Sequence, residues 1–413
     1  MENQTLILLP NVFPYGKGDA FLESEIKFLT KDFQRIIVFP SIYEEGVRSM
    51  PSSIELNNAL LNTNEYKVSN SEVLQYFVTK GWFWKDLLRV VDFTSFKNSF
   101  YRFFNFCKLA YKKFRALENF IETEKINKSG LIIYSYWFVS HAMAIALLRK
   151  KYPQIKGVTR THEYDLYEKG TYRLPFRKFI ADKLNSIVPI SEDGQNYLTS
   201  RYGIKGEKIE LFNLGVENEF VAKKEFHSNS FRLLSVAFIS ERKRIDLIAE
   251  AIAHLAKIET NIEFEWIHIG DGDEQIKQKI NDIIGELPSN FECTFPGSLP
   301  NQKVLAFYKE NLDIDAFINV SSSEGKPVSI MEAQSYAIPV IATKVGGVAE
   351  IVNDENGVLL SANPSPKEVS EGIQSLIEVD IRKDKSSASY KTWNTHYNAK
   401  KNYSKFTTFL KDL

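Results

Sequence analysis

The chain has 413 residues, enough for two to three domains of about 150 residues each, and 44% of them are hydrophobic, which suffices for sizeable cores. Basic and acidic residues balance at 52 each, so no overall field would attract nucleic acid, and no such partner is expected. The two cysteines lack the spacing of a zinc site or a disulfide scaffold, which is typical of a reducing cytoplasm.

The first residues, MENQTLILLPN, lack the positive charge and the long apolar core of a secretory signal, and no stretch approaches the ~20 apolar residues that cross a bilayer. We therefore expect a cytoplasmic protein. Residues 75–121 interleave aromatic side chains with lysine and arginine, as in GWFWKDLL. Two interpretations stay open: helices that bury aromatics in a core, or a peripheral face at the inner surface of a membrane.

Short apolar runs separated by amphipathic stretches predict strands that alternate with helices. In chain order they are TLILLPN, RIIVFPS, GLIIYSYW, GVTRTH, SIVPIS and IELFNLG, then FRLLSVAF, FEWIHIG, FECTFPG, DAFINVS, PVIATKV and GVLLSA. Continuous apolar strands are typical of parallel sheets covered by helices on both faces. The sequence therefore predicts an α/β chain with two doubly wound, Rossmann-like domains, residues 1–215 and 216–390. A helix is predicted for residues 391–413. It could pack against either domain, and it could return to the N-terminal one.

The strand DAFINVS leads through SSSEGKP into a helix that we expect to begin near Pro327. In open α/β sheets ligands bind at such strand-to-helix loops, and the free amides of Val328 and Ser329 would form an anion site. Glu324 stays in the loop, whereas Glu332 falls about a turn and a half into the helix. A carboxylate accepts two hydroxyl protons at once, so the pair could contact different parts of one sugar-containing ligand. Alternatively, Glu324 favours the helix dipole and Glu332 lies on an exposed face.

The segment SEGKPVSIMEAQSYAIPVIATKVGGVAEIV closely resembles the signature of the family-four retaining glycosyltransferases, which have the GT-B fold of two Rossmann-like domains facing across a cleft. KRIDLIAEAI, WIHIGDGDEQIKQKI and FPGSLPNQKVLAFY also resemble the donor domain of that family, and TRTHEYDLY resembles its first domain less sharply. The resemblance implies an acceptor-side N-terminal domain and a C-terminal domain that binds a nucleotide diphosphate-sugar. Residues 60–130 carry no such signature.

The resemblance also implies roles for single residues. Glu324 would contact hydroxyls of the donor sugar, Glu332 would hold the ribose, and Lys243 would bind the diphosphate and stabilise the leaving group. His162 would face the donor from the first domain. The expected catalytic set is Glu324, Lys243 and His162, and the expected donor-binding set is Glu332, Gly325, Lys326, Pro327, Val328, Ser329, Arg242, Arg244, Gly270 and Leu299.

Some of these positions have simpler explanations. The arginine that usually accompanies the lysine is missing, because SVAF offers Ala237 and Phe238, and Arg242 or Arg244 could substitute. Without the resemblance, ERKR is typical of a solvated surface, and a lone His162 at a strand end is typical of a structural histidine.

Three residues of the first domain are expected at the acceptor side of the cleft. Gly16 and Gly18 occupy the place of the family's first-domain glycine loop, where small residues let backbone approach a diphosphate or an acceptor. Asp165 could orient His162 or cap the next helix.

Two further patterns resemble other kinds of site. IGDGDEQ is similar to a dinucleotide fingerprint, but Gln275 stands at the third glycine, so Gly270 and Gly272 are interpreted as a tight turn beside the nucleotide. The DID of residues 313–315 is similar to a metal-binding Asp-x-Asp, but it precedes an apolar strand and is interpreted as the start of that strand. No metal or other cofactor is expected.

The predicted function is transfer of a sugar, with retention, from a nucleotide diphosphate-sugar to a hydroxyl of a glycan or lipid-linked glycan, as in surface polysaccharide biosynthesis. Two alternatives stay open. One is a sugar phosphorylase or nucleotide-sugar epimerase on the same fold, and the other is a catalytically silent partner that binds nucleotide-sugar.

Overall fold

The computed structural model describes residues 4–16, 18–19, 21–61, 68–168, 170, 173–219 and 224–413. The chain divides into two compact units, Met1–Leu214 with Lys400–Leu413, and Gly215–Ala399. The sequence suggested a boundary at residue 390 rather than 399. Each unit is built on one six-stranded sheet whose strand pairs are parallel, so the expected pair of doubly wound α/β sheets is confirmed.

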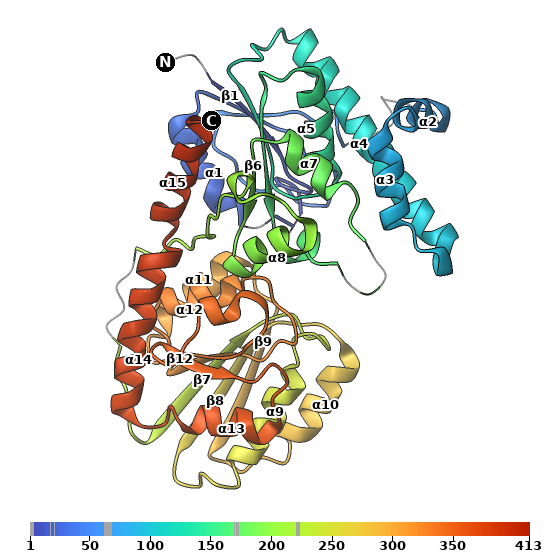
Figure 1. The fold of residues 1–413 in the computed structure, drawn as a ribbon. Helices are drawn as coiled ribbons and strands as arrows, with labels where there is room; N and C mark the ends of the chain where they lie inside the picture. The colour runs from blue at the N-terminus through green and yellow to red at the C-terminus, as the bar shows by residue number, and fades with distance from the viewer. Residues whose placement is uncertain are drawn as a thin grey trace. The chain divides into compact units, whose positions relative to one another are not determined.

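The N-terminal unit has the strand order β3-β2-β1-β4-β5-β6. Its strands are β1 (Thr5–Leu9), β2 (Arg35–Val38), β3 (Ile54–Leu56), β4 (Leu131–Ser135), β5 (Lys156–Thr161) and β6 (Ser186–Pro189). Its helices are α1 (Leu22–Asp32), α2 (Asn70–Val78), α3 (Gly81–Val90), α4 (Phe96–Thr123), α5 (Ser140–Lys151), α6 (Glu163–Leu166), α7 (Arg177–Lys183) and α8 (Glu192–Tyr202), and 3-10 turns cover Phe93–Ser95 and Gly206–Lys208 (Figure 1).

Alternation along the strands buries both faces of this sheet. Ile7 and Leu9 of β1 join a core with α4, α5 and α7, whereas Leu6 and Leu8 join a second core on the opposite face. That second core also holds residues of α1 and of the C-terminal helix α15 (Ala399–Lys411), whose Phe406 is fully buried. The last helix therefore completes the N-terminal unit (Figure 1).

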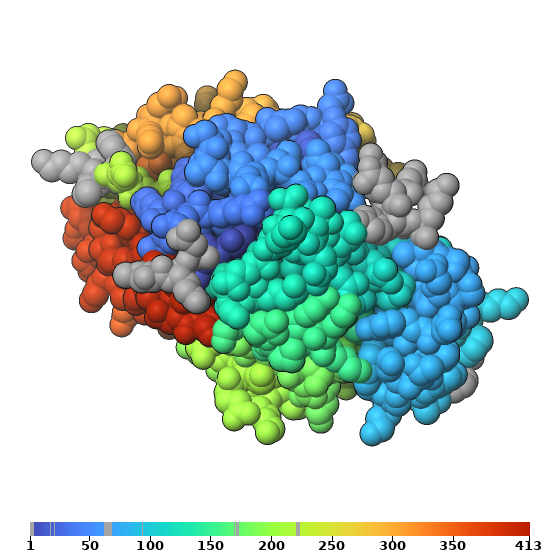
Figure 2. Space-filling model, turned by 90° about the horizontal axis from the view of Figure 1, so that it is seen from above, coloured from blue at the N-terminus to red at the C-terminus, as the bar shows by residue number. Residues whose placement is uncertain are grey.

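The aromatic segment 75–121 forms the end of α2, all of α3 and most of α4. Many of its aromatic side chains are buried in the core, including Phe77, Phe83 and Phe103, which fits the core interpretation for those residues. Other aromatic side chains are exposed, such as Tyr101, which exposes 69% of its surface. The aliphatic Leu88 in the same segment exposes the same fraction. Figure 2 shows the α2–α3 region as a lobe of the N-terminal unit beside α4. Among the described residues, none of the helices is both long and apolar enough to cross a bilayer.

The second unit has the strand order β12-β11-β10-β7-β8-β9. Its strands are β7 (Ser230–Val236), β8 (Glu263–Ile269), β9 (Phe291–Gly297), β10 (Ala316–Asn319), β11 (Val340–Thr343) and β12 (Gly357–Leu360). Its helices are α9 (Ile245–Leu255), α10 (Glu274–Ile284), α11 (Asn301–Glu310), α12 (Val328–Ser335), α13 (Pro366–Gln374) and α14 (Val379–Thr392), with a 3-10 turn at Gly346–Glu350 and a π-helical turn at Trp393–Tyr397.

Both sheets reverse their strand order at one point, between β1 and β4 in the first unit and between β7 and β10 in the second. The helices that follow such a pair of strands leave in opposite directions, and a crevice opens at the carboxyl ends of the two strands. Each unit therefore has one preferred place for a ligand. The loops after β7 and β10 contain Lys243 and Glu324.

Candidate functional site

Lys243 and Glu324 meet at the reversal point of the second sheet. The ammonium of Lys243 donates a hydrogen bond to Oε1 of Glu324, and Nη1 of Arg242 lies 3.7 Å from Oε2 of the same carboxylate. Glu324 exposes 7% of its surface, so these cations offset much of the cost of burying its charge. The structure thus brings together one acidic and two basic side chains from loops that are about 80 residues apart in sequence.

The two candidate replacements for the missing arginine have different roles. Arg244 has a left-handed backbone with φ of 53° and ends its loop at the start of α9. Its guanidinium donates to the carbonyls of Val320 and Ser321 at 2.6 and 2.9 Å and to Oδ1 of Asn363 at 3.0 Å. Arg244 therefore joins its own loop to the loops after β10 and β12, whereas Arg242 lies beside the carboxylate of Glu324.

Helix α12 begins where the sequence placed it. Pro327 is its N-cap residue, Val328 its first residue, and its backbone amides point toward the loop that carries Glu324. Gly325 is buried, and its carbonyl accepts a hydrogen bond of 2.9 Å from the amide of Gly347. Ser329, half-buried in the first turn, belongs to the same helix end.

Lys326 lies in the same loop but has its own partner. Its ammonium is 2.7 Å from Oε2 of Glu350 and 5.3 Å from the ring centre of Tyr397. The side chain is almost fully buried. The Lys326–Glu350 ion pair thus fixes the Gly-Lys-Pro turn to the 3-10 turn that follows β11.

Gly346 explains the double glycine of the sequence signature. Its φ is +50°, and a Cβ atom added there would lie 1.8 Å from the carbonyl oxygen of Glu324. Only glycine lets the loop after β11 approach the Glu324 backbone so closely. The position of Glu324 therefore depends on this contact.

Glu332 is buried on α12, with 7% of its surface exposed. Nδ2 of Asn301, the first residue of α11, donates a hydrogen bond of 2.8 Å to its Oε1. Burial raises the pKa of Glu332 to about 7, against the opposing effect of the Asn301 bond. The contact with Asn301 also brings the loop after β9, which contains Leu299, close to this carboxyl group. The alternative of an exposed Glu332 is wrong.

Gly270 and Gly272 form the tight turn expected after β8. A Cβ atom on Gly270 would lie 1.8 Å from the carbonyl oxygen of Ala237, and one on Gly272 would lie 2.1 Å from that of Ile239. Their contacts join the loops after β7 and β8. A cavity of about 520 Å³ opens beside them. Its lining comprises Phe238, Ile239, Ser240, Glu241, Arg242, Gly272 and Asp273.

The glycine loop of the first unit is closed by an aspartate that the sequence analysis did not single out. The carboxylate of Asp19 accepts hydrogen bonds from the amides of Val12 and Phe13 at 2.6 and 3.0 Å, and one of 2.5 Å from the indole of Trp137. Gly16 has a φ of 53°, which glycine adopts without strain. The Gly18 carbonyl accepts a hydrogen bond from Arg48.

His162 follows β5 and lies beside the same loop. Its ring centre is 4.5 Å from that of Trp137 and 4.8 Å from that of Tyr136. Neither ring nitrogen has a hydrogen-bond partner among the described residues. Burial, and then the charge of Arg160, lowers the pKa of His162 to about 3, so the imidazole is neutral at physiological pH.

Asp165 does not touch the ring of His162 in a hydrogen bond. Its carboxylate accepts the backbone amide of His162 at 2.7 Å and the hydroxyl of Thr161 at 2.8 Å. Burial raises its pKa to about 6, although Arg177 opposes the shift. The sequence left two roles open for Asp165, orienting the His162 ring or capping the next helix. The structure shows the capping contact at the start of α6.

The carboxylates of the DID segment are held by arginines. Asp315 pairs with the buried Arg382 and accepts the amide of Arg232 at 2.8 Å, and Asp313 pairs with the Arg232 side chain. These contacts anchor the start of β10, as interpreted from the sequence. Within the described part of the chain, no group of three or more His, Cys, Asp or Glu side chains could hold a metal ion.

Comparison with known proteins defines the class. Residues 216–392 match the family model of the glycosyl transferases group 1. An uncharacterized glycosyltransferase of Methanocaldococcus jannaschii, MJ1178, is 28% identical over 278 residues, which cover 64% of this chain and 72% of that protein. The match to the group 1 glycosyl transferases covers the second unit, and the family resemblance seen in that part of the sequence is confirmed there.

One further relative and one solved structure extend this result. The amylovoran biosynthesis glycosyltransferase AmsK of Erwinia amylovora is 28% identical over 47% of this chain, and the match spans only 46% of that protein. The crystal structure of Anabaena HepE in complex with UDP and glucose superposes with a TM-score of 0.63 at 14% identity, covering 99% of this chain and 100% of that one. The whole chain therefore has the GT-B glycosyltransferase fold.

Proposed function

We propose that the protein is a retaining glycosyltransferase that moves a sugar from a nucleotide diphosphate-sugar to a hydroxyl of a glycan or lipid-linked glycan in surface polysaccharide biosynthesis. The observation that carries this proposal is the pairing of Lys243 with Glu324 at the amino end of α12. The relative AmsK supports a role in polysaccharide biosynthesis, because it is named for the biosynthesis of amylovoran.

The donor would separate this ion pair by giving each partner a ligand group. Its diphosphate takes the ammonium of Lys243, with Arg242 beside it, and the sugar hydroxyls donate to the carboxylate of Glu324. The amides that begin α12 add dipole stabilisation for the phosphate oxygens. Glu332 receives the ribose hydroxyls, and Gly270 and Leu299 lie on the loops that border the nucleotide.

In the proposed step the acceptor oxygen attacks the anomeric carbon on the face from which the diphosphate departs. The bond between that carbon and the phosphate oxygen breaks as the new glycosidic bond forms, and the acceptor proton moves to the leaving phosphate. Lys243 and the helix amides stabilise the charge that develops on the diphosphate. No metal or other cofactor takes part in this proposal.

The N-terminal unit would supply the acceptor side. Gly16 and Gly18 follow β1, one of the two strands whose carboxyl ends border the ligand crevice, and neutral His162 follows β5 in the same sheet. Asp165 accepts a hydrogen bond from the backbone amide of His162 and none from its imidazole, so it positions the backbone of His162. In this proposal the imidazole contributes a neutral hydrogen bond to the substrate, since a pKa of about 3 leaves it uncharged.

We place the protein in the cytoplasm, peripherally at the inner face of the membrane. Cys107 and Cys293 are free thiols, as in a reducing compartment. Trp84, Leu88, Phe96 and Tyr101 expose large apolar surfaces on α3 and α4, among basic side chains. Flotation with vesicles containing phosphatidylglycerol tests this location, and binding equal to that of Trp84→Ser with Leu88→Ser would contradict it.

A panel of nucleotide diphosphate-sugars tests the function. A matching donor raises the melting temperature, since ligand at 100 times its dissociation constant adds about 2.7 kcal/mol of stability. Mass spectrometry of the product with glycan acceptors then detects transfer and its anomeric configuration. Epimerised donor, phosphate-dependent release, or donor binding without turnover on every acceptor would overturn the proposal in favour of an epimerase, a phosphorylase or a silent partner.

A further inference from the structure

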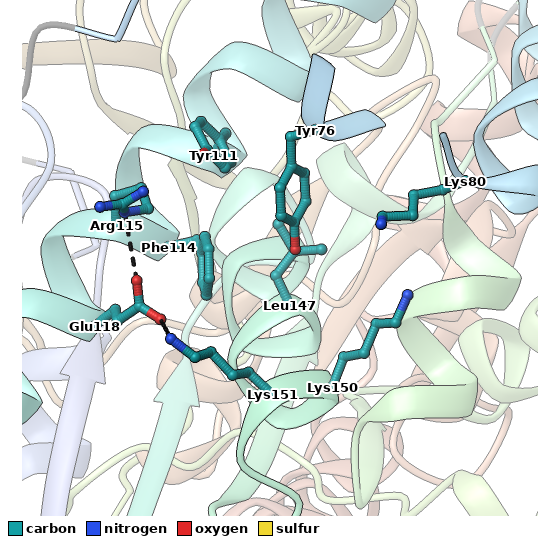
Figure 3. A pocket seen from close by; sticks show the side chains of 9 residues that line it. All are labelled: Tyr76, Lys80, Tyr111, Phe114, Arg115, Glu118, Leu147, Lys150 and Lys151. Atoms are coloured by element: carbon teal, nitrogen blue, oxygen red, sulfur yellow. Dashed lines mark hydrogen bonds and ion pairs between the residues drawn. The ribbon is translucent and has the colours of Figure 1, made fainter. Parts of the chain in front are cut away.

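A second cavity lies in the N-terminal unit, away from the residues discussed so far. It has a volume of about 370 Å³, within the usual size of small-molecule sites. Helices α2, α4 and α5 provide its lining, together with Lys80, the residue just before α3 (Figure 3). The lining comprises Tyr76, Lys80, Tyr111, Phe114, Arg115, Glu118, Leu147, Lys150 and Lys151.

Its position separates it from the acceptor loop of the same unit. Parallel strands all end at one edge of the sheet, and the helix that follows a strand runs back toward the other edge. Lys150 and Lys151 form the last turn of α5, the helix after β4. They therefore lie toward the edge where strands begin, whereas Gly16 and His162 follow strand ends.

One wall of the cavity is aromatic. The ring centre of Tyr76 lies 4.8 Å from that of Tyr111 and 6.0 Å from that of Phe114, and the planes are tilted by 41° and 36°. Tyr111 and Phe114 are buried, and Leu147 lies deeper in the core. Tyr76 is only partly buried and points its hydroxyl into the cavity (Figure 3). Aromatic faces with a hydroxyl at the edge suit the apolar face and hydroxyls of a sugar ring.

The rest of the lining is cationic. Glu118 is its one carboxylate, and it pairs with both Lys151 at 2.7 Å and Arg115 at 3.4 Å. Lys80 and Lys150 form no ion pair with any described side chain. Each ammonium lies 5.7 Å from the centre of an aromatic ring, that of Tyr76 for Lys80 and that of Trp82 for Lys150. Their ammonium groups lie on the same side of the cavity as the Tyr76 hydroxyl (Figure 3). The nearness of Lys80 contributes to a lowered pKa for Lys150, after the larger effect of burial.

Two like charges held near each other without a counter-ion favour an anion between them. We propose that this cavity binds an anionic saccharide unit, a hexuronic acid or a hexose phosphate, with Lys80 and Lys150 on its charged group and Tyr76 against its ring. The choice of a saccharide rests on the proposed function, since a transferase that builds a polysaccharide meets such units along its acceptor. The site would hold part of the chain away from the reacting hydroxyl.

The binding test uses the full chain and calorimetry at low salt, with three probes: a tetrasaccharide of alternating glucuronic acid and N-acetylglucosamine, glucose 6-phosphate, and neutral maltotetraose. At least one anionic sugar should bind ten times more tightly than maltotetraose and than inorganic phosphate. Lys80→Gln with Lys150→Gln should weaken that binding at least tenfold. The control Lys85→Gln with Lys97→Gln makes the same change of charge on exposed sites and should leave it unaltered.

Tyr76→Phe and Tyr76→Leu separate the roles of hydroxyl and ring, and circular dichroism melts confirm that each variant is folded. Tyr76→Leu should weaken binding more than Tyr76→Phe. The proposal is overturned if neither anionic sugar binds, if phosphate alone binds as tightly, if the control variant loses as much affinity, or if the cavity variant loses only binding to phosphatidylglycerol vesicles, which would assign the site to a lipid headgroup.

Donor binding, measured on the same samples by thermal shift, keeps the two proposals apart. A protein that binds a nucleotide-sugar but no anionic saccharide contradicts the cavity assignment alone. One that binds the saccharide but no nucleotide-sugar contradicts the proposed function and leaves the cavity assigned. The cavity variants should retain the full donor shift, because Lys80 and Lys150 belong to the other unit of the chain.

Discussion

The indole of Trp137 donates a hydrogen bond of 2.5 Å to Asp19, and the same ring lies 4.5 Å from His162. Through this contact the loop after β4 fixes the glycine loop after β1, across the reversal point of the first sheet. Asp19 also accepts two backbone amides, so its carboxylate is the common partner of both loops.

Trp137→Phe should keep the ring beside His162 but lose this bond. We expect the free energy of unfolding to fall by about 1.5–3 kcal/mol, the range for a hydrogen bond to a charged group. Urea denaturation of the two proteins measures the difference. Trp84→Phe is the matched control, because its indole donates to the exposed Val78 carbonyl at 2.8 Å. A loss of similar size in both variants would refute the special role of Asp19.

Lys243→Ala and Glu324→Gln each remove one half of the ion pair at α12. Transfer should slow by about 2–4 kcal/mol of barrier, or roughly 30- to 1,000-fold, the scale for one electrostatic contact to a developing charge. Steady-state rates with saturating donor give the comparison. Lys367→Ala, on an exposed face of α13, should retain the parent rate. Full activity in both ion-pair variants would contradict the assignment.

The strands show what the sequence could and could not specify. The apolar runs of the second unit predicted all of β7 to β12, including the edge strand β9, whose residues alternate between exposed and more buried positions. The first unit differs twice. β3 (Ile54–Leu56) was missed because it is short and largely exposed, and IELFNLG is not a strand, since only Ile209 bridges to Ile187 of β6. Both errors lie at an edge of the first sheet, where a short segment has a neighbouring strand on one side only.

The residues of the candidate site also fall into those that the sequence could indicate and those that it could not. Glu324 and Glu332 could be proposed from their local spacing around one strand-loop-helix unit, and Lys243 from the family resemblance and its place near the start of a helix. Asn301 and Trp137 could not, since the partners of their side chains lie 31 and 118 positions away. Weak signals were present: Asn301 opens a helix inside a segment that resembles the family, and Trp137 follows a strand end. Neither signal names the partner.

Gly346→Ala should disturb Glu324 without touching its side chain. The added methyl meets the Glu324 carbonyl, and alanine at φ of +50° is itself strained by about 1–2 kcal/mol. We expect lower stability and a transfer rate reduced about tenfold or more, since a small misplacement of a positioning group is costly. Gly206→Ala is the control, because nothing lies within 4 Å of its added methyl. An unchanged rate in Gly346→Ala would show that the contact does not position Glu324.

Glu332 should make the stability of the protein depend on pH. Burial raises its pKa to about 7 in the folded chain, above the ordinary glutamate value of 4.5, so the folded state binds more protons than the unfolded state between these values. Stability must then fall as pH rises from about 4.5 to 7, by up to roughly 3 kcal/mol from this group. Glu332→Gln removes the titration and keeps an acceptor for Asn301. Melting temperatures of both proteins from pH 4.5 to 8 should therefore show a smaller decline in the variant. Parallel curves would mean that the carboxyl group is ionised throughout this range, which would contradict the raised pKa.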